Sequence, residues 1–163
     1  MTSPTLDRRS FTSLGRALRD WRVLRTPKIG AALRELIILH VSSVNGCPVC
    51  SVAHGLAGRA SGLGREDIRA ARACEPTDPR FDERTRVALR YAELRTLDQE
   101  RAHTDEGAEF AALFDPEEQR EVRAIVDLFT FNNRFNNTWE RWLPGAERRR
   151  ERLGLCDLDR EKA

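Results

Sequence analysis

The stretch Leu36–Gly58, LIILHVSSVNGCPVCSVAHGLAG, contains no Asp, Glu, Lys or Arg. In the whole chain 33% of the 163 residues are charged, so a gap of this length indicates a buried segment. The segment also carries polar side chains and a turn-forming Asn45-Gly46 near its middle, which argue against a membrane span. It predicts two core helices that fold back on each other at Asn45-Gly46.

Length and composition favour one folded domain of ordinary size with a substantial core. Hydrophobic residues make up 40% of the chain, too many for a wholly disordered protein. The net charge of +2 is too balanced for a general phosphate-backbone binder. The N-terminus, MTSPTLDRRSF, lacks the apolar core of a secretory signal. We therefore expect a cytoplasmic protein that binds neither nucleic acid nor a membrane.

Outside the gap, apolar residues recur every three or four positions, which is typical of helices, and no sustained alternation predicts a strand. Asp115-Pro116-Glu117-Glu118 combines an N-cap, a proline at the first helical position and an acid three residues after the cap. The expected helices cover about 6–24, 31–44, 47–60, 65–73, 82–97, 105–113 and 116 to near Pro144.

These elements predict an all-α fold in a single domain over residues 1–163. Its core would lie at about 10–143, followed by a charged tail at 144–163 that packs loosely or forms a short helix. The centre would be an antiparallel helix hairpin that carries the Cys-x-x-Cys motif.

Aromatic residues alternate with Asn and Arg in FTFNNRFNNTWERW, residues 129–142, a pattern that could indicate RNA binding. Phe131, Phe135, Trp139 and Trp142 fall on one helical stripe, so we interpret them as core or subunit interface instead. A similar stripe, Phe11, Leu14, Leu18 and Trp21, predicts an amphipathic first helix.

Cys47, Cys50 and His54 are spaced by three and four residues, so they share one face of a helix. Pro48 makes Cys47 the expected N-cap and leaves Cys50 in the first turn. Both sulfurs then lie near unsatisfied N–H groups at the positive end of the helix dipole, which favours thiolate over thiol. His54, one turn after Cys50, can accept a proton from that thiol.

Glu35 is the last acidic residue before the gap. In an antiparallel hairpin Glu35 and His54 are both roughly 12–15 Å from the turn, at about 1.5 Å per residue, so they can face each other. The carboxylate would orient the imidazole and raise its basicity, giving a Glu-His-Cys relay with a second cysteine in reach for a disulfide. Ser42, two turns from Glu35, could join this group by a hydrogen bond.

A zinc-binding structural or regulatory module using Cys47, Cys50 and His54 is an alternative from a different class. It needs a fourth ligand, for which Cys74, His40 and Glu35 are the candidates. Cys74 is otherwise expected to be a small buried apolar residue.

The joint spacing Glu35-x11-Cys47-x2-Cys50-x3-His54 resembles the signature of the alkylhydroperoxidase D-like branch of the carboxymuconolactone decarboxylase superfamily. The resemblance implies an all-helical protomer that assembles into trimers, hexamers or other homo-oligomers. It also implies a thiol peroxidase without a cofactor or metal. Such an enzyme reduces a hydroperoxide and is restored by a lipoylated or thioredoxin-like dithiol partner.

By this resemblance Cys50 attacks the peroxide, Cys47 resolves the sulfenic acid, and Glu35 and His54 form the proton relay. Asn133 would match an Asn-Arg pair that lies near the redox centre in the family. Family members often carry His or Tyr beside the second cysteine, where this chain has Val49, so turnover with peroxide could be low or the substrate different. A non-catalytic helical oligomer or a decarboxylase-like relative is the remaining alternative.

Overall fold

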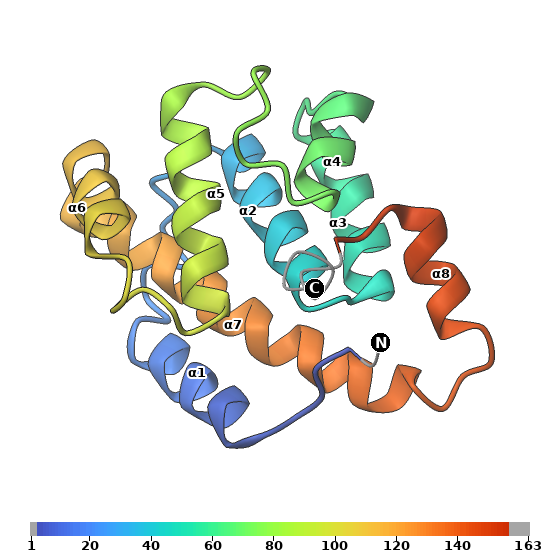
Figure 1. Ribbon diagram of the computed structural model, residues 1–163. Coiled ribbons are helices and arrows are strands. Elements are labelled where there is room, and N and C mark those ends of the chain that lie inside the picture. Colours follow the sequence, from blue (N-terminus) through green and yellow to red (C-terminus); the bar gives the residue numbers. More distant parts are fainter. Residues whose placement is uncertain (1–2, 157–163) are drawn as a thin grey trace.

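The computed structural model describes residues 3–156, which form eight helices and no strand (Figure 1). The all-α prediction is confirmed. In chain order the helices are α1 (Arg8–Arg19), α2 (Ala31–Val44), α3 (Pro48–Ala60), α4 (Arg65–Arg72), α5 (Glu83–Thr96), α6 (Thr104–Leu113), α7 (Pro116–Glu140) and α8 (Ala146–Leu153). Residues 157–163 of the predicted tail lie outside the described residues.

Helix α2 is the central element, because it packs against α3, α4, α5 and α7 (Figure 1). Its residues from Leu36 to Ser43 are all buried. They meet apolar side chains of α5 and α7, among them Leu89 and Ile125, in the main hydrophobic core. The α2 half of the charge-free gap is therefore buried on several sides, as predicted, whereas the α3 half exposes Val49, Val52 and Leu56.

The hairpin of α2 and α3 forms around Asn45-Gly46, as expected. The Asn45 side chain donates to the Val41 carbonyl at 3.0 Å, and Gly46 has a φ of +59°, which favours glycine. Gly58 of α3 faces α2, where a Cβ would lie 3.7 Å from Glu35 Cβ and from Leu39 Cδ1. The two helices consequently lie side by side along their length.

The predicted start of α7 is confirmed. Asp115 accepts from the backbone N–H groups of Glu117 and Glu118, and Glu118 closes the capping box. The predicted first helix is too long, because α1 ends at Arg19 and turns follow to residue 26.

Two aromatic stripes face outward instead of toward the core. On α1 the buried residues are Ser10, Ser13 and Ala17, and these small side chains let α1 lie close to α7. Large apolar side chains are exposed on the outer faces of α1, α3 and α7, and just after the ends of α1 and α7: Phe11, Leu18, Trp21, Val49, Val52, Leu56, Phe135, Trp139, Trp142 and Leu143. We call this set the exposed apolar surface. The core interpretation of Phe135, Trp139 and Trp142 is thus wrong, whereas the subunit-interface interpretation stays a prediction.

Within residues 3–156 no helix is both long and apolar enough to cross a membrane.

Candidate active site

Glu35 and His54 meet across the hairpin, as the helix arithmetic predicts. His54 Nδ1 lies 2.7 Å from Glu35 Oε2. A carboxylate can only accept, so Nδ1 carries the hydrogen in this pair and Nε2 is the nitrogen left for proton exchange. The ring of Phe129 packs edge-on against the imidazole, with centroids 4.8 Å apart. Together these contacts fix the tautomer and the orientation of His54.

The two cysteines lie at the start of α3 and are both buried free thiols. Cys47 is the N-cap, as predicted, and its Sγ accepts from the Cys50 backbone N–H at 3.4 Å. Pro48 occupies the first helical position, where its missing N–H costs nothing. Asn136 of α7 donates its amide Nδ2 to Cys50 Sγ at 3.2 Å.

The surroundings shift the pKa values of the two thiols in opposite directions. A hydrogen bond from the Cys47 thiol, the Asn136 amide and the positive charge of His54 lower the pKa of Cys50 to about 7, against burial and the Glu140 charge. The same hydrogen bond, burial and the Cys50 charge raise the pKa of Cys47. At neutral pH a large fraction of Cys50 is therefore thiolate, beside a protonated Cys47.

Ser42 and Asn133 are both buried and contact each other, with Ser42 Oγ 3.3 Å from Asn133 Oδ1. The Ser42 carbonyl also accepts from the Cys47 backbone N–H at 2.8 Å. The hydroxyl thus links α2 to α7, whereas the sequence suggested a bond toward the Glu35 relay. Ser42 thus holds the residue that caps α3, and Asn133 holds Ser42.

The sequence marks Asn136 as one of four asparagines that are poor helix formers and so candidates for hydrogen bonding near the site, but it singles out Asn133 and misses Glu140. Asn136 and Glu140 lie one and two turns after Asn133 on α7. Glu140 is buried at 3% exposure, and its charge raises the pKa of both cysteines. The available signal was the repeat of polar residues at steps of three and four along an otherwise aromatic helix. That repeat indicates a buried polar face, but it does not say which element the face contacts.

Helix α7 also holds the hairpin turn. Asn137 Nδ2 donates to the Asn45 carbonyl at 2.7 Å, and Arg134 Nε donates to Asn45 Oδ1 at 3.3 Å. Arg134 is itself held by Asp7 at 3.0 Å. Because Asn45 lies two residues before Cys47, these bonds fix the position of the dithiol.

None of the three candidates for a fourth zinc ligand, Cys74, His40 and Glu35, is without another partner. Glu35 is paired with His54, and His40 Nε2 faces Glu93 Oε2 at 3.3 Å. Cys74 is bonded to Cys156. Within residues 3–156 no group of three or more His, Cys, Asp or Glu side chains is placed to hold a metal ion.

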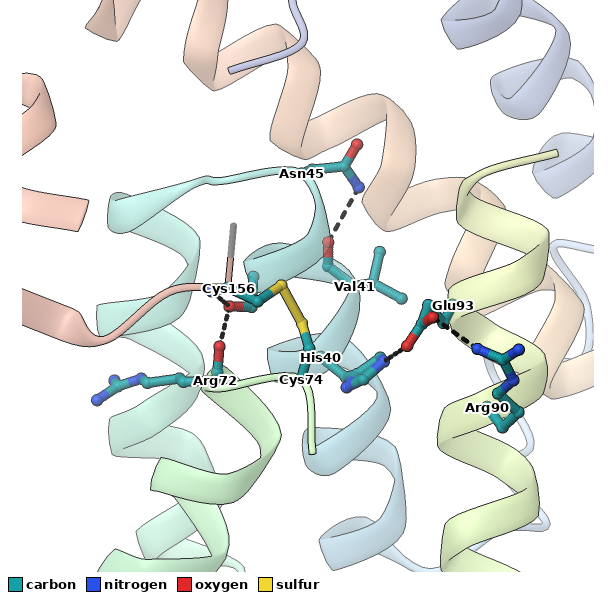
Figure 2. The surroundings of a disulfide bond; sticks show 9 residues. His40, Val41, Asn45, Arg72, Cys74, Arg90, Glu93 and Cys156 are labelled. Atoms are coloured by element: carbon teal, nitrogen blue, oxygen red, sulfur yellow. Dashed lines mark hydrogen bonds and ion pairs between the residues drawn. A yellow bond between two sulfur atoms is a disulfide. The ribbon is translucent and has the colours of Figure 1, made fainter. Parts of the chain in front are cut away.

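The Cys74–Cys156 disulfide corrects the interpretation of Cys74 as a buried apolar residue (Figure 2). Both cysteines are partly exposed. Sequence could not pair them, because they are 82 positions apart. The bond joins the segment after α8 to the segment after α4.

A cavity of about 510 Å³ lies between the N-terminal segment, the end of α7 and α8. It is lined by Asn137, Arg141 and Arg150 among others, and by neither Cys47, Cys50 nor His54. The side chains beside the cysteines on the outer face of α3 are instead the exposed Val49 and Val52. Cys50 itself is 6% exposed.

Among known proteins, the family model described as the carboxymuconolactone decarboxylase family matches residues 15–94. The match runs from α1 to α5 and includes Glu35, Cys47, Cys50 and His54. Helices α6 to α8, with Asn136, Glu140 and Cys156, lie outside it. No curated protein and no solved structure matches the chain.

Proposed function

We propose, from the match of residues 15–94 to the carboxymuconolactone decarboxylase family model, a thiol-dependent peroxidase and disulfide oxidoreductase of the alkylhydroperoxidase D-like type. The observation that carries the proposal is the pair of unequal thiols beside an oriented histidine. A lowered pKa at Cys50 supplies the nucleophile at neutral pH. Cys47, three residues away, is in position to form a disulfide with it.

In the first step the Cys50 thiolate attacks the terminal oxygen of a hydroperoxide and the O–O bond breaks. A sulfur–oxygen bond forms, and the alkoxide that leaves takes a proton from His54 Nε2. Cys50 is oxidised to a sulfenic acid and the hydroperoxide is reduced to an alcohol. Glu35 stabilises the imidazolium before this transfer, through its 2.7 Å bond to Nδ1.

In the second step the Cys47 sulfur attacks Cys50 Sγ. The sulfenic hydroxyl leaves with the Cys47 proton as water, and a Cys47–Cys50 disulfide forms. An external dithiol then supplies two electrons and two protons, which restore both thiols. We propose a lipoylated or thioredoxin-like protein for this role, in the cytoplasm.

The substrate is an organic hydroperoxide in preference to hydrogen peroxide. Val49 and Val52 are 56% and 47% exposed beside the cysteines, so an apolar substituent would be desolvated there. Val49 cannot transfer protons, which leaves His54 as the proton donor in this scheme. The exposed apolar surface supports assembly into a homo-oligomer, for which we propose a trimer or hexamer, because many exposed large apolar side chains are typical of interfaces.

The test counts free thiols before and after one equivalent of cumene hydroperoxide, and maps the product by mass spectrometry. We expect loss of two thiols and a Cys47–Cys50 disulfide. Cys50→Ser should abolish consumption, whereas Cys47→Ser should stop after one turnover at a Cys50 sulfenic acid. Consumption by Cys50→Ser at the parent rate would contradict the assignment. One zinc per chain, lost on either Cys→Ser change, would favour the metal-binding alternative.

A further inference from the structure

Helix α8 has no fully buried side chain, and its apolar residues Ala146 and Leu153 are only partly buried, so apolar packing contributes little to holding it on the molecule. Its docking instead depends on a few specific contacts, and each of them joins α8, or the segment that follows it, to residues near Cys47 and Cys50. The helix lies at the edge of the fold next to α3 (Figure 1).

The first contact is an ion pair. Arg149 Nε of α8 lies 3.1 Å from Glu140 Oε1 at the end of α7. Glu140 Oε2 is buried without a hydrogen-bond partner, so Arg149 is the group that compensates this carboxylate. The charge of Glu140 acts on both Cys47 and Cys50. Arg149 therefore limits the repulsion between Glu140 and a Cys50 thiolate.

The second contact reaches the hairpin turn, where Arg150 Nε donates to the Gly46 carbonyl at 3.0 Å. Gly46 is the residue immediately before Cys47. A detached α8 would thus remove Arg150 from the turn before Cys47 and Arg149 from Glu140 at the same time.

The third contact is covalent. The Cys156 backbone N–H donates to the Arg72 carbonyl and to Ser43 Oγ, each at 3.0 Å, so the Cys74–Cys156 bond lies against the end of α2 (Figure 2). The Arg72 guanidinium in turn donates to the Ser51 carbonyl at 2.6 Å, beside Cys50. The disulfide consequently fastens the segment that leaves α8 to elements that surround the dithiol.

Cys74 also has a backbone conformation that is uncommon for its residue type, with a φ of +55°. This is the left-handed position that follows the C-cap of α4, where the Glu75 backbone N–H donates to the Ala70 carbonyl at 3.1 Å and closes the helix end. Both cysteines of the bond are partly exposed, in contrast to the buried Cys47 and Cys50. A dithiol reductant can therefore reach them.

We propose that Cys74 and Cys156 form a second redox site, a latch that keeps α8 docked and Arg149 paired with Glu140, so that opening the disulfide lowers the reactivity of Cys50. The inference rests on the proposed function in one respect, because it requires Cys50 to react as a thiolate. A reducing dithiol opens the latch by giving two electrons and two protons, which leaves thiols at both positions and a disulfide in the reductant.

A hydroperoxide closes the latch again. One of the two thiolates takes the terminal oxygen and becomes a sulfenic acid, releasing an alcohol after protonation. The other sulfur then displaces water and restores the S–S bond. The peroxidase site is thus most reactive when hydroperoxide is present, and its reactivity falls when dithiol dominates.

The experiment measures the rate at which iodoacetamide alkylates Cys50 across pH 5–9, a readout that needs no peroxidase activity. We expect Cys74→Ser/Cys156→Ser and Arg149→Gln to slow alkylation at pH 6 by about threefold to tenfold, since an uncompensated carboxylate nearby raises a thiol pKa by about half a unit to one unit. Arg152→Gln, the same change at an exposed site on α8, should match the parent.

The decisive variant adds Glu140→Gln to Cys74→Ser/Cys156→Ser, and the alkylation rate should return to the parent value or above. Hydrogen exchange of α8 should rise when the latch is reduced, while α2 stays protected. If the double Cys variant does not fold, Arg149→Gln still tests the charge with the disulfide intact. The latch proposal would be overturned if Cys74→Ser/Cys156→Ser and Arg149→Gln were both alkylated at the parent rate, or if adding Glu140→Gln did not restore the rate. Either result would leave the proposed peroxidase function standing. An alkylation midpoint near pH 8.5 in the parent would instead overturn the proposed function as well.

Discussion

The first half of α7 buries mainly apolar side chains, together with Glu121 and Asp127, which pair with arginines of α1, α2 and α5; the second half buries polar side chains. Between Pro116 and Leu128 the buried residues include Val122, Ala124, Ile125 and Val126, which join the main core or lie beside it. Between Phe129 and Glu140 the buried residues are Thr130, Asn133, Arg134, Asn137 and Glu140, while Phe135 and Trp139 are exposed.

The difference follows from what each half packs against. The first half meets the apolar faces of α2 and α5, where burial of methyl groups stabilises the fold. The second half meets the hairpin turn and the dithiol, which present a carbonyl, an amide and a sulfur that need partners. One helix therefore serves stability at its start and the candidate site at its end.

The largest expected effect on stability is at Ile125 in the first half. Ile125→Ala should lower the free energy of unfolding by about 2–5 kcal/mol, since it leaves a cavity in the core. The pH midpoint of Cys50 alkylation should stay unchanged. Denaturant unfolding measures the first quantity, with Leu143→Ala at an exposed position as the control. A shifted alkylation midpoint would mean that the two halves are not separate in function.

Asn136 in the second half should show a smaller effect on stability and a larger one on reactivity. Asn136→Ala removes a hydrogen bond to the thiolate, so the pKa of Cys50 should rise from about 7. Alkylation then slows at pH 6–7, and the rates converge at a pH above both pKa values. Loss of one such bond costs about 1 kcal/mol of stability. Asn132→Ala, on the same helix, is the matched control. An unchanged pH profile would remove Asn136 from the site.

The smallest effect on protomer stability is expected at Trp139, which is 64% exposed. Trp139→Ser should change the free energy of unfolding by no more than about 0.5 kcal/mol. If the exposed apolar surface joins subunits, sedimentation velocity should show a smaller assembly for this variant. Arg152→Gln, which changes an exposed site outside that surface, should sediment like the parent. Equal sedimentation of Trp139→Ser and the parent would exclude this part of the surface as the interface.

Much of the fold was readable in the sequence because it depends on neighbours along the chain. The caps at Asp115 and Cys47 and the turn at Asn45-Gly46 are short-range features. The contact of Glu35 with His54 follows from the same features by counting residues from the turn.

The sequence did not reveal that α1 and α7 turn their aromatic faces toward the outside of the molecule. A periodic stripe of aromatic residues predicts a helix, but it gives only a preference for which face is buried. Here small side chains such as Ser10 and Ala17 on α1, and hydrogen-bonding ones such as Asn137 on α7, occupy the inner faces.

By itself the sequence determined the helices, the hairpin and the spacing that places two thiols and an imidazole on one face. The tertiary structure added to the hydrogen bond from Cys47 a second donor that favours the Cys50 thiolate, because Asn136 reaches Cys50 from 86 positions away. It also decided that Cys74 pairs with Cys156 and that Arg149 meets Glu140. The physical reason is that acidity depends on charges and donors brought close in space, and a disulfide pairing requires two sulfurs brought together, which spacing along the chain does not fix.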